Sequence, residues 1–201
     1  MRYFILLLSA ALFWSCSSAV KCTSNFDQYL NDDFLKLWNA ETNKAMIKKG
    51  DKKSIFLLDF EKKHNLSVFG RKDFLKSFKQ GKIYSEISFS ELWVLEINYS
   101  GEKNQRIKYL MGICGNACHM TKWTEGVRGW LASEDHKIKT EDFENLYTVL
   151  NRNDDKRSYW GGNITEIASL TQFKDGNQIS VQVFGALNKM QFDTINGLNF
   201  K

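Results

Sequence analysis

Residues 93–113, WVLEINYSGEKNQRIKYLMGI, decide the fold class of this chain. Apolar residues alternate with other residues at both ends of the stretch, at Trp93, Leu95, Ile97 and Tyr99 and again at Ile107, Tyr109, Met111 and Ile113. A period of two is typical of strands with one buried face. Because a short polar segment with a glycine, residues 100–104, lies between the two runs, the stretch predicts an antiparallel hairpin.

The part of the chain before this hairpin has helical periodicity. Apolar residues recur at three- and four-residue spacing from residue 26 to residue 45, which predicts an amphipathic helix ending near Gly50. Residues 74–78 indicate a short helix. Residues 55–60 form an apolar run that fits either a buried helix or a strand. We therefore expect helices to dominate the N-terminal part of the domain.

The part after the hairpin alternates between irregular, helical and extended patterns. We expect the glycine-rich segment 114–129 to be irregular and a helix to begin at Thr140. Residues 164–173 and 178–187 flank a Lys-Asp-Gly-Asn turn and predict a second hairpin. Together these patterns predict an α+β fold, with N-terminal helices followed by antiparallel β hairpins and one inserted helix, in a single domain over 25–201.

Composition narrows the class of protein. The chain has 201 residues, of which 43% are hydrophobic and 14% aromatic, so it can bury enough surface to fold. Four cysteines are too few for a disulfide-dense miniprotein. The sequence contains no proline, so its turns depend on Gly, Asn and Asp.

Positive charge gathers in one part of the sequence. Residues 44–82 contain 12 Lys and Arg against 4 Asp and Glu, whereas residues 83–155 contain 8 against 12. Such a run forms either a solvated helix face or a basic face toward anionic lipid or glycan. Nucleic acid is not an expected partner, because the positive charge is mostly lysine, which lacks the planar fork with which arginine binds phosphate.

The N-terminus carries a targeting signal. Arg2 precedes an apolar stretch of 12 residues, 3–14, which is too short for a membrane-spanning helix but typical of a secretory signal peptide. Ser15 and Cys16 follow directly. A small residue before a cysteine at this position resembles the lipobox of bacterial lipoproteins. In that family the signal peptide is cleaved before the cysteine, whose thiol carries diacylglycerol.

This resemblance implies an organisation for the whole chain. Residues 1–15 would be a lipoprotein-type signal peptide and residues 16–24 a short lipid-anchored tether, with Cys16 as the lipidation site. The expected location is the extracytoplasmic side of a bacterial cell envelope, and the membrane is a partner through the lipid anchor. The alternative is ordinary signal cleavage after Ala19, where Ser17 and Ala19 supply small residues.

The most distinctive local sequence is GICGNACHM, residues 112–120. Two cysteines separated by three small residues can come within disulfide range in an oxidising compartment. We therefore predict a disulfide between Cys114 and Cys118, with a modest gain in stability because the loop is short.

The same residues allow a redox alternative. Cys114, Cys118 and His119 resemble a longer variant of the attachment motif of c-type cytochromes, which implies covalent haem with His119 as the proximal ligand. Met111, Met120 or His136 would then be sixth-ligand candidates. Cys114, Cys118, His119 and Met120 also contain the soft ligands that copper prefers. The primary expectation is no cofactor.

Aromatic residues beside glycines form a candidate ligand site. Trp123, Trp130, Tyr159 and Trp160 have flat rings that can stack on an envelope glycan if they are exposed. Core packing is the competing interpretation, because most tryptophans are largely buried.

Motifs of the common enzyme classes are missing from the sequence. There is no Gly-x-Ser-x-Gly, no His-Glu-x-x-His and no nucleotide-binding glycine loop. The sequence therefore favours a non-enzymatic, lipid-anchored envelope protein that acts as a binding or accessory module for a glycan or a protein. The alternatives are a haem or copper redox protein and an envelope-glycan hydrolase.

Overall fold

The computed structural model describes residues 22, 31–64, 69–80, 89–100, 105–115, 117–132, 136–151, 165–174, 178–184, 187 and 189–198. The helices among them are α2 (Asp32–Lys49), α3 (Lys52–His64), α4 (Arg71–Gln80), α5 (Thr140–Asn151) and α6 (Lys189–Leu198). The strands are β1 (Glu91–Ser100), β2 (Gln105–Cys114), β3 (Ala117–Gly126), β4 (Gly129–Ala132), β5 (His136–Lys139), β6 (Thr165–Lys174) and β7 (Gln178–Phe184). Helices come first and antiparallel strands follow with α5 inserted, which confirms the predicted α+β class.

All of these strands belong to one antiparallel sheet. Its order is β4-β3-β2-β1-β6-β7, and β5 also pairs with β3. The predicted hairpin is β1 and β2, with Trp93 opposite Met111. The second predicted hairpin is β6 and β7. Because β1 pairs with β6 as well as with β2, the first hairpin forms the centre of the sheet.

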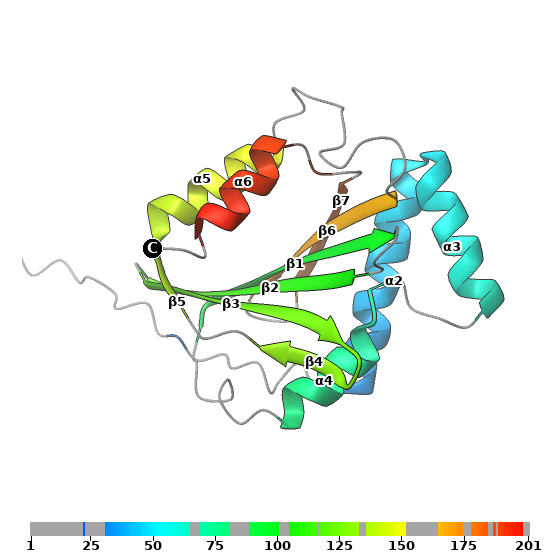
Figure 1. Cartoon of the computed structure of the whole chain (residues 1–201), viewed down its shortest axis with the longest axis horizontal. Coiled ribbons are helices and arrows are strands. Elements are labelled where there is room, and N and C mark those ends of the chain that lie inside the picture. The colour runs from blue at the N-terminus through cyan, green and yellow to red at the C-terminus, as the bar shows by residue number, and fades with distance from the viewer. Residues whose placement is uncertain are drawn as a thin grey trace, which may run out of the picture.

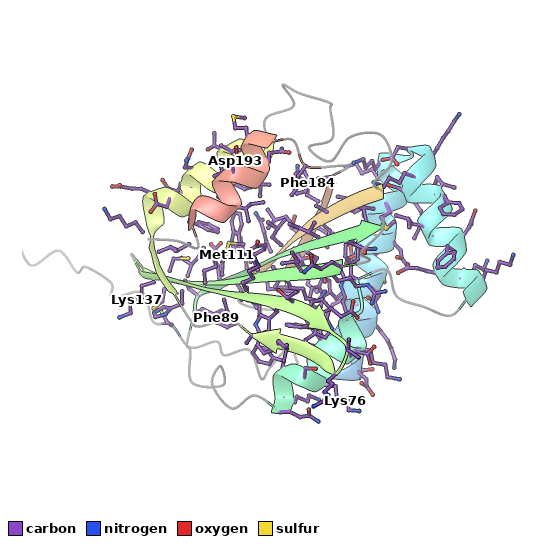
Figure 2. The ribbon with its side chains drawn as sticks, viewed as in Figure 1. Lys76, Phe89, Met111, Lys137, Phe184 and Asp193 are labelled. Carbon is purple, nitrogen blue, oxygen red and sulfur yellow. A yellow bond between two sulfur atoms is a disulfide. The ribbon has the colours of Figure 1, made fainter. Side chains whose placement is uncertain are left out.

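Helices cover both faces of the sheet (Figure 1). We call them the α5/α6 face and the α2/α4 face. Residues of α5 and α6 form one buried cluster with Trp93, Leu95 and Met111. Residues of α2 and α4 form another with Leu92, Val94 and Leu110. Figure 2 shows side chains filling the space on both sides of the strands. The alternation in β1 and β2 predicts only one buried face, so the second core is a finding of the structure.

Local signals explain where α2 begins and ends. The Asn31 side chain accepts a hydrogen bond from the Phe34 backbone N–H at 2.7 Å, as an N-cap does. Acidic residues occupy the first turn and lysines the last, which matches the helix dipole. Gly50 ends the helix with a φ of 66°, a left-handed conformation that favours glycine. The predicted end near Gly50 is confirmed.

The structure settles one ambiguous segment, corrects one expectation and adds one helix. Residues 55–60 lie in a helix, α3, rather than in a strand. The segment 114–129, expected to be irregular, contains the long strand β3 and the start of β4. It lacks a simple alternation because its apolar residues change faces along β3, from Cys118 and Met120 on the α5/α6 face to Trp123 on the α2/α4 face. The C-terminal helix α6 had no predicted counterpart. Within the described part of the chain, no helix is both long and apolar enough to cross a membrane.

Candidate functional site

Three polar side chains lie side by side on the α2/α4 face, in the centre of the sheet. The strand register places Glu96 of β1 opposite Lys108 of β2 on one side and opposite Ser169 of β6 on the other. Their relative exposures are 0%, 1% and 0%. A carboxylate and a lysine are therefore buried together beside the apolar cluster of this face.

Arg71 completes this cluster from the first residue of α4. Gly70, with a φ of 57°, precedes it in a left-handed conformation that favours glycine. Arg71 Nε donates to both carboxylate oxygens of Glu96, at 3.1 and 3.0 Å, and Nη2 donates to Oε2. Arg71 Nη1 donates to Asn39 Oδ1 at 3.0 Å, and the guanidinium lies 4.2 Å from the centroid of the Trp38 ring. The forked contact with Glu96 and the ring below hold the guanidinium in one position.

Lys108 and Ser169 supply the remaining contacts of Glu96. Lys108 Nζ donates to Glu96 Oε1 and to the Phe69 carbonyl oxygen, the latter at 2.7 Å. The same ammonium lies 4.9 Å from the centroid of the Trp130 ring. Ser169 Oγ donates to Glu96 Oε2 at 3.2 Å. Each oxygen of the buried carboxylate thus accepts from several donors, as buried charge requires.

The cluster contains two cations and one carboxylate. Burial raises the pKa of Glu96, but the charges of Arg71 and Lys108 outweigh burial and leave that pKa below its usual value. Burial lowers the pKa of Lys108 to about 8; Glu96 opposes this shift and Arg71 adds to it. When Lys108 is protonated, the cluster carries one more positive than negative charge.

A pocket of about 570 Å³ adjoins this cluster, between α2 and α3. Its walls include apolar residues of both helices, namely Met46, Ile47, Ile55 and Leu58. Asn39 and Arg71 also line it. Arg71 is 1% exposed and is therefore one of the buried residues of the lining, as are Thr42 and Met46. The buried charge cluster is therefore connected to a cavity of the size that small-molecule sites have.

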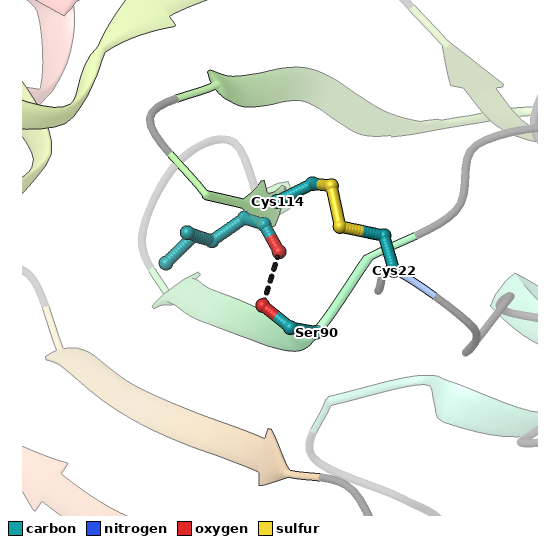
Figure 3. The surroundings of a disulfide bond; sticks show 4 residues. Cys22, Ser90 and Cys114 are labelled. Carbon is teal, nitrogen blue, oxygen red and sulfur yellow. Dashed lines mark hydrogen bonds between the residues drawn. A yellow bond between two sulfur atoms is a disulfide. The ribbon is translucent and has the colours of Figure 1, made fainter. Parts of the chain in front are cut away.

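The predicted disulfide between Cys114 and Cys118 is wrong. Cys114 is bonded to Cys22, with the two Cα atoms 5.7 Å apart (Figure 3). Beside this bond, the Ser90 backbone N–H and Oγ both donate to the Ile113 carbonyl oxygen, at 2.8 and 3.0 Å. Cys118 is present as a buried thiol.

The β2–β3 register explains the correction. Cys114 pairs with Ala117, and Ile113 pairs with Cys118, across a turn that contains Gly115 at a φ of 57°. Because side chains alternate along a strand, Cys114 and Cys118 point to opposite faces of the sheet. Cys118 joins the buried cluster of the α5/α6 face.

The same alternation separates the residues of the haem and copper alternative. Cys118 and Met120 are buried on the α5/α6 face, whereas Cys114 and His119 lie in register positions of the opposite face. These four residues therefore do not converge on one point. Within the described ranges, no three His, Cys, Asp or Glu side chains form a group that could hold a metal ion.

The proposed glycan platform is corrected for its two described tryptophans. Trp123 and Trp130 are 2% and 4% exposed and pack edge-on against Phe74, with ring centroids 5.4 and 5.5 Å apart. They belong to the core of the α2/α4 face rather than to an open sugar-binding surface. Tyr159, Trp160 and the expected lipidation site Cys16 lie outside the described residues.

Sequence patterns did not single out the buried charge cluster, although they contain a signal for it. Glu96 and Lys108 each lie inside a strand between apolar neighbours, and alternation assigned both to the solvated face. A charged residue within such a run is either exposed or paired in the interior. The two charged residues are buried because α2 and α4 pack onto that face, which the strand sequences alone do not show.

Comparison with known proteins supplies no relative. No family model, no curated protein and no solved structure matches this chain.

Proposed function

We propose that this protein is an extracytoplasmic, lipid-anchored module of a bacterial cell envelope, with a binding or accessory role rather than a catalytic one. The observation that carries the proposal is the disulfide between Cys22 and Cys114. Disulfides form and persist in oxidising compartments and are rare in the cytosol. The bond therefore supports a location on the extracytoplasmic side, where the N-terminal signal would direct the chain.

The disulfide also relates the anchor to the folded domain. Cys22 is six residues beyond Cys16, and six extended residues reach at most about 20 Å. With Cys16 acylated, the end of β2 that carries Cys114 would lie within about 20 Å of the bilayer surface. The remainder of the domain would project from that attachment point.

A binding role is supported by the pocket between α2 and α3. It combines apolar walls with the buried Arg71 and the Asn39 amide, a combination that suits recognition of a small ligand. The carboxylate and the ammonium behind it are held in mutual contacts that leave them buried, an arrangement suited to electrostatic recognition rather than to proton transfer with solvent.

The test is localisation of a Cys16→Ala variant beside the wild-type chain. We expect the wild type in the membrane fraction, with an intact mass that includes acyl chains. The Cys16→Ala variant should remain an unprocessed or mislocalised precursor, because acylation precedes cleavage in the lipoprotein route. Cys118→Ala is the matched control and should localise as the wild type does. A Cys16→Ala chain that is processed normally and released in soluble form outside the cytoplasm would overturn the anchor.

Intact mass also tests the disulfide. Reduction of the wild type should add about 2 Da, the mass of two hydrogens, and peptide mapping should join Cys22 to Cys114. Protein purified from its native membrane in which both thiols are alkylated without prior reduction would contradict the extracytoplasmic proposal.

A further inference from the structure

We propose that the pocket between α2 and α3 binds a small amphipathic carboxylate, a molecule with one carboxylate on an apolar body. The carboxylate would lie beside Arg71 and Asn39, and the apolar body would lie against the apolar residues of α2 and α3. This inference rests on the proposed binding role, and it does not depend on the lipid anchor.

The apolar half of the site comes from residues of two helices, α2 and α3. Met46 and Ile47 of α2 face the pocket from one side, and Ile55 and Leu58 of α3 from the other. Ile55 and Leu58 are three residues apart and share one face of α3, whereas on α2 the lining continues from Met46 and Ile47 through Thr42 and Asn43 toward Asn39. A volume of about 570 Å³ accommodates a ligand of this kind.

The polar half of the site is the guanidinium of Arg71. A guanidinium has five N–H donors. Among the described residues, its hydrogen bonds to Glu96 and Asn39 engage Nε–H, one Nη1–H and one Nη2–H. One N–H on each terminal nitrogen remains for a ligand, and two such donors match the two oxygens of a carboxylate.

Charge favours an anion at this end. Behind the pocket, Arg71 and Lys108 share the single negative charge of Glu96. Burying a charge without a counterion is costly, so a ligand carboxylate at Arg71 would offset the excess positive charge. The same argument disfavours a neutral alcohol of equal length.

Charged residues of α3 in the pocket lining limit which further charges the ligand can have. Asp59, Glu61 and Lys62 of α3 also line the pocket. Two carboxylates there oppose ligands with several negative charges, whereas they tolerate a ligand that also bears an ammonium group. The shared chemistry is therefore a single carboxylate, which either a short-chain acyl anion or an apolar dipeptide can supply.

The experiment is calorimetric titration of the full chain, disulfide intact, with sodium octanoate, 1-octanol and the dipeptide Leu-Leu. We expect at least one of the two acids to bind about ten-fold or more tightly than 1-octanol, because only the acids make charge-assisted hydrogen bonds to Arg71. Tighter binding of octanoate identifies the acyl source, and tighter binding of Leu-Leu identifies the peptide source.

Adjacent residues of α3 provide a matched pair of variants. Ile55 lines the pocket and is 41% exposed, whereas its neighbour Phe56 is 65% exposed and is not part of the lining. Ile55→Asp should weaken binding of the acid by about ten-fold or more, and Phe56→Asp should leave it within about two-fold. Asn39→Asp, which is isosteric and places a carboxylate beside Arg71, should weaken it as strongly.

Two outcomes would overturn the inference. One is that 1-octanol binds as tightly as both acids or that neither acid binds. The other is that Ile55→Asp and Phe56→Asp change binding equally. Neither outcome affects the localisation of the Cys16→Ala variant. Failure of this inference is therefore distinguishable from failure of the anchor proposal.

Discussion

The two faces of the central sheet differ in whether they bury charged side chains. The cluster of the α5/α6 face is formed by hydrophobic side chains, among them Leu95, Met111 and the thiol of Cys118. The α2/α4 face has a core of similar aromatic and aliphatic character, but it also buries Arg71, Glu96 and Lys108. Both faces bury large apolar side chains, so hydrophobic stabilisation does not require the charges.

This difference indicates what each face is for. Buried ion pairs are weak stabilisers, because the cost of taking charges out of water offsets much of their attraction. The charge cluster lies beside a pocket, and titratable groups with perturbed pKa values in a cleft are often part of a functional site. This position suits recognition of a ligand. Both faces therefore stabilise the fold, and the α2/α4 face in addition carries the charge cluster beside the proposed binding pocket.

The largest expected change in stability comes from substitutions at two adjacent residues of β1 that lie on opposite faces of the sheet. Glu96→Ala should lower the free energy of unfolding by about 3–5 kcal/mol, because it leaves two buried cations without a counterion. Leu95→Ala, on the other face, should cost about 2–5 kcal/mol by leaving a cavity. Urea unfolding of both variants measures these changes.

A second substitution distinguishes the two mechanisms. Lys108→Met should restore part of the stability lost in Glu96→Ala and none of that lost in Leu95→Ala. Equal effects of Lys108→Met in both backgrounds would show that charge is not what distinguishes the faces.

The cysteines give the next effect in size. Cys22→Ser should lower the free energy of unfolding by about 2–4 kcal/mol, because the disulfide links residues 92 positions apart and restrains a long loop. Cys118→Ala should cost only about 1 kcal/mol, since it removes one buried sulfur from the α5/α6 face. Thermal or urea unfolding with and without reductant checks both values: Cys118→Ala should remain sensitive to reductant, and Cys22→Ser should not.

Replacing the charge cluster by apolar residues separates stability from function. The triple variant Arg71→Met, Glu96→Leu, Lys108→Met should be as stable as the wild type or more stable by about 1–4 kcal/mol. The same variant should lose binding of the carboxylate ligand, because the guanidinium is gone. A triple variant that still binds the acids as the wild type does would assign recognition to other residues.

The last difference between the faces is a pH dependence of stability that Lys108 gives to the α2/α4 face. The pKa of Lys108 is about 8 in the folded protein and returns to about 10.5 on unfolding, so between these values the unfolded state binds more protons. Stability contributed by Lys108 should therefore rise with pH from about 8 to 10.5, by at most about 1.4 kcal/mol per pH unit. Below pH 8 the contribution is flat.

The measurement is urea unfolding across this pH range for the wild type and Lys108→Met. The difference between the two curves isolates Lys108 from the other groups that titrate there. A difference that falls with rising pH would contradict the burial of the ammonium.

Much of the fold was accessible from sequence because its signals are local. Alternation in residues 93–113 predicted β1 and β2, the Lys-Asp-Gly-Asn turn predicted β6 and β7, and capping at Asn31 and Gly50 limits α2. Strand β3 was missed because its apolar residues change faces along the strand, from Cys118 and Met120 on the α5/α6 face to Trp123 on the α2/α4 face, so its sequence lacks a sustained period of two.

The disulfide and the candidate site were decided only by tertiary structure, because both depend on residues that are far apart in sequence. Spacing alone favoured Cys114 with Cys118, whereas side-chain alternation across the β2–β3 turn directs Cys114 to Cys22. The sequence by itself determined that Glu96 lies in a strand. Two further facts depend on how the helices pack: this carboxylate meets Arg71, 25 residues away, and Arg71 lines a pocket between α2 and α3. No local pattern in the sequence encodes that packing.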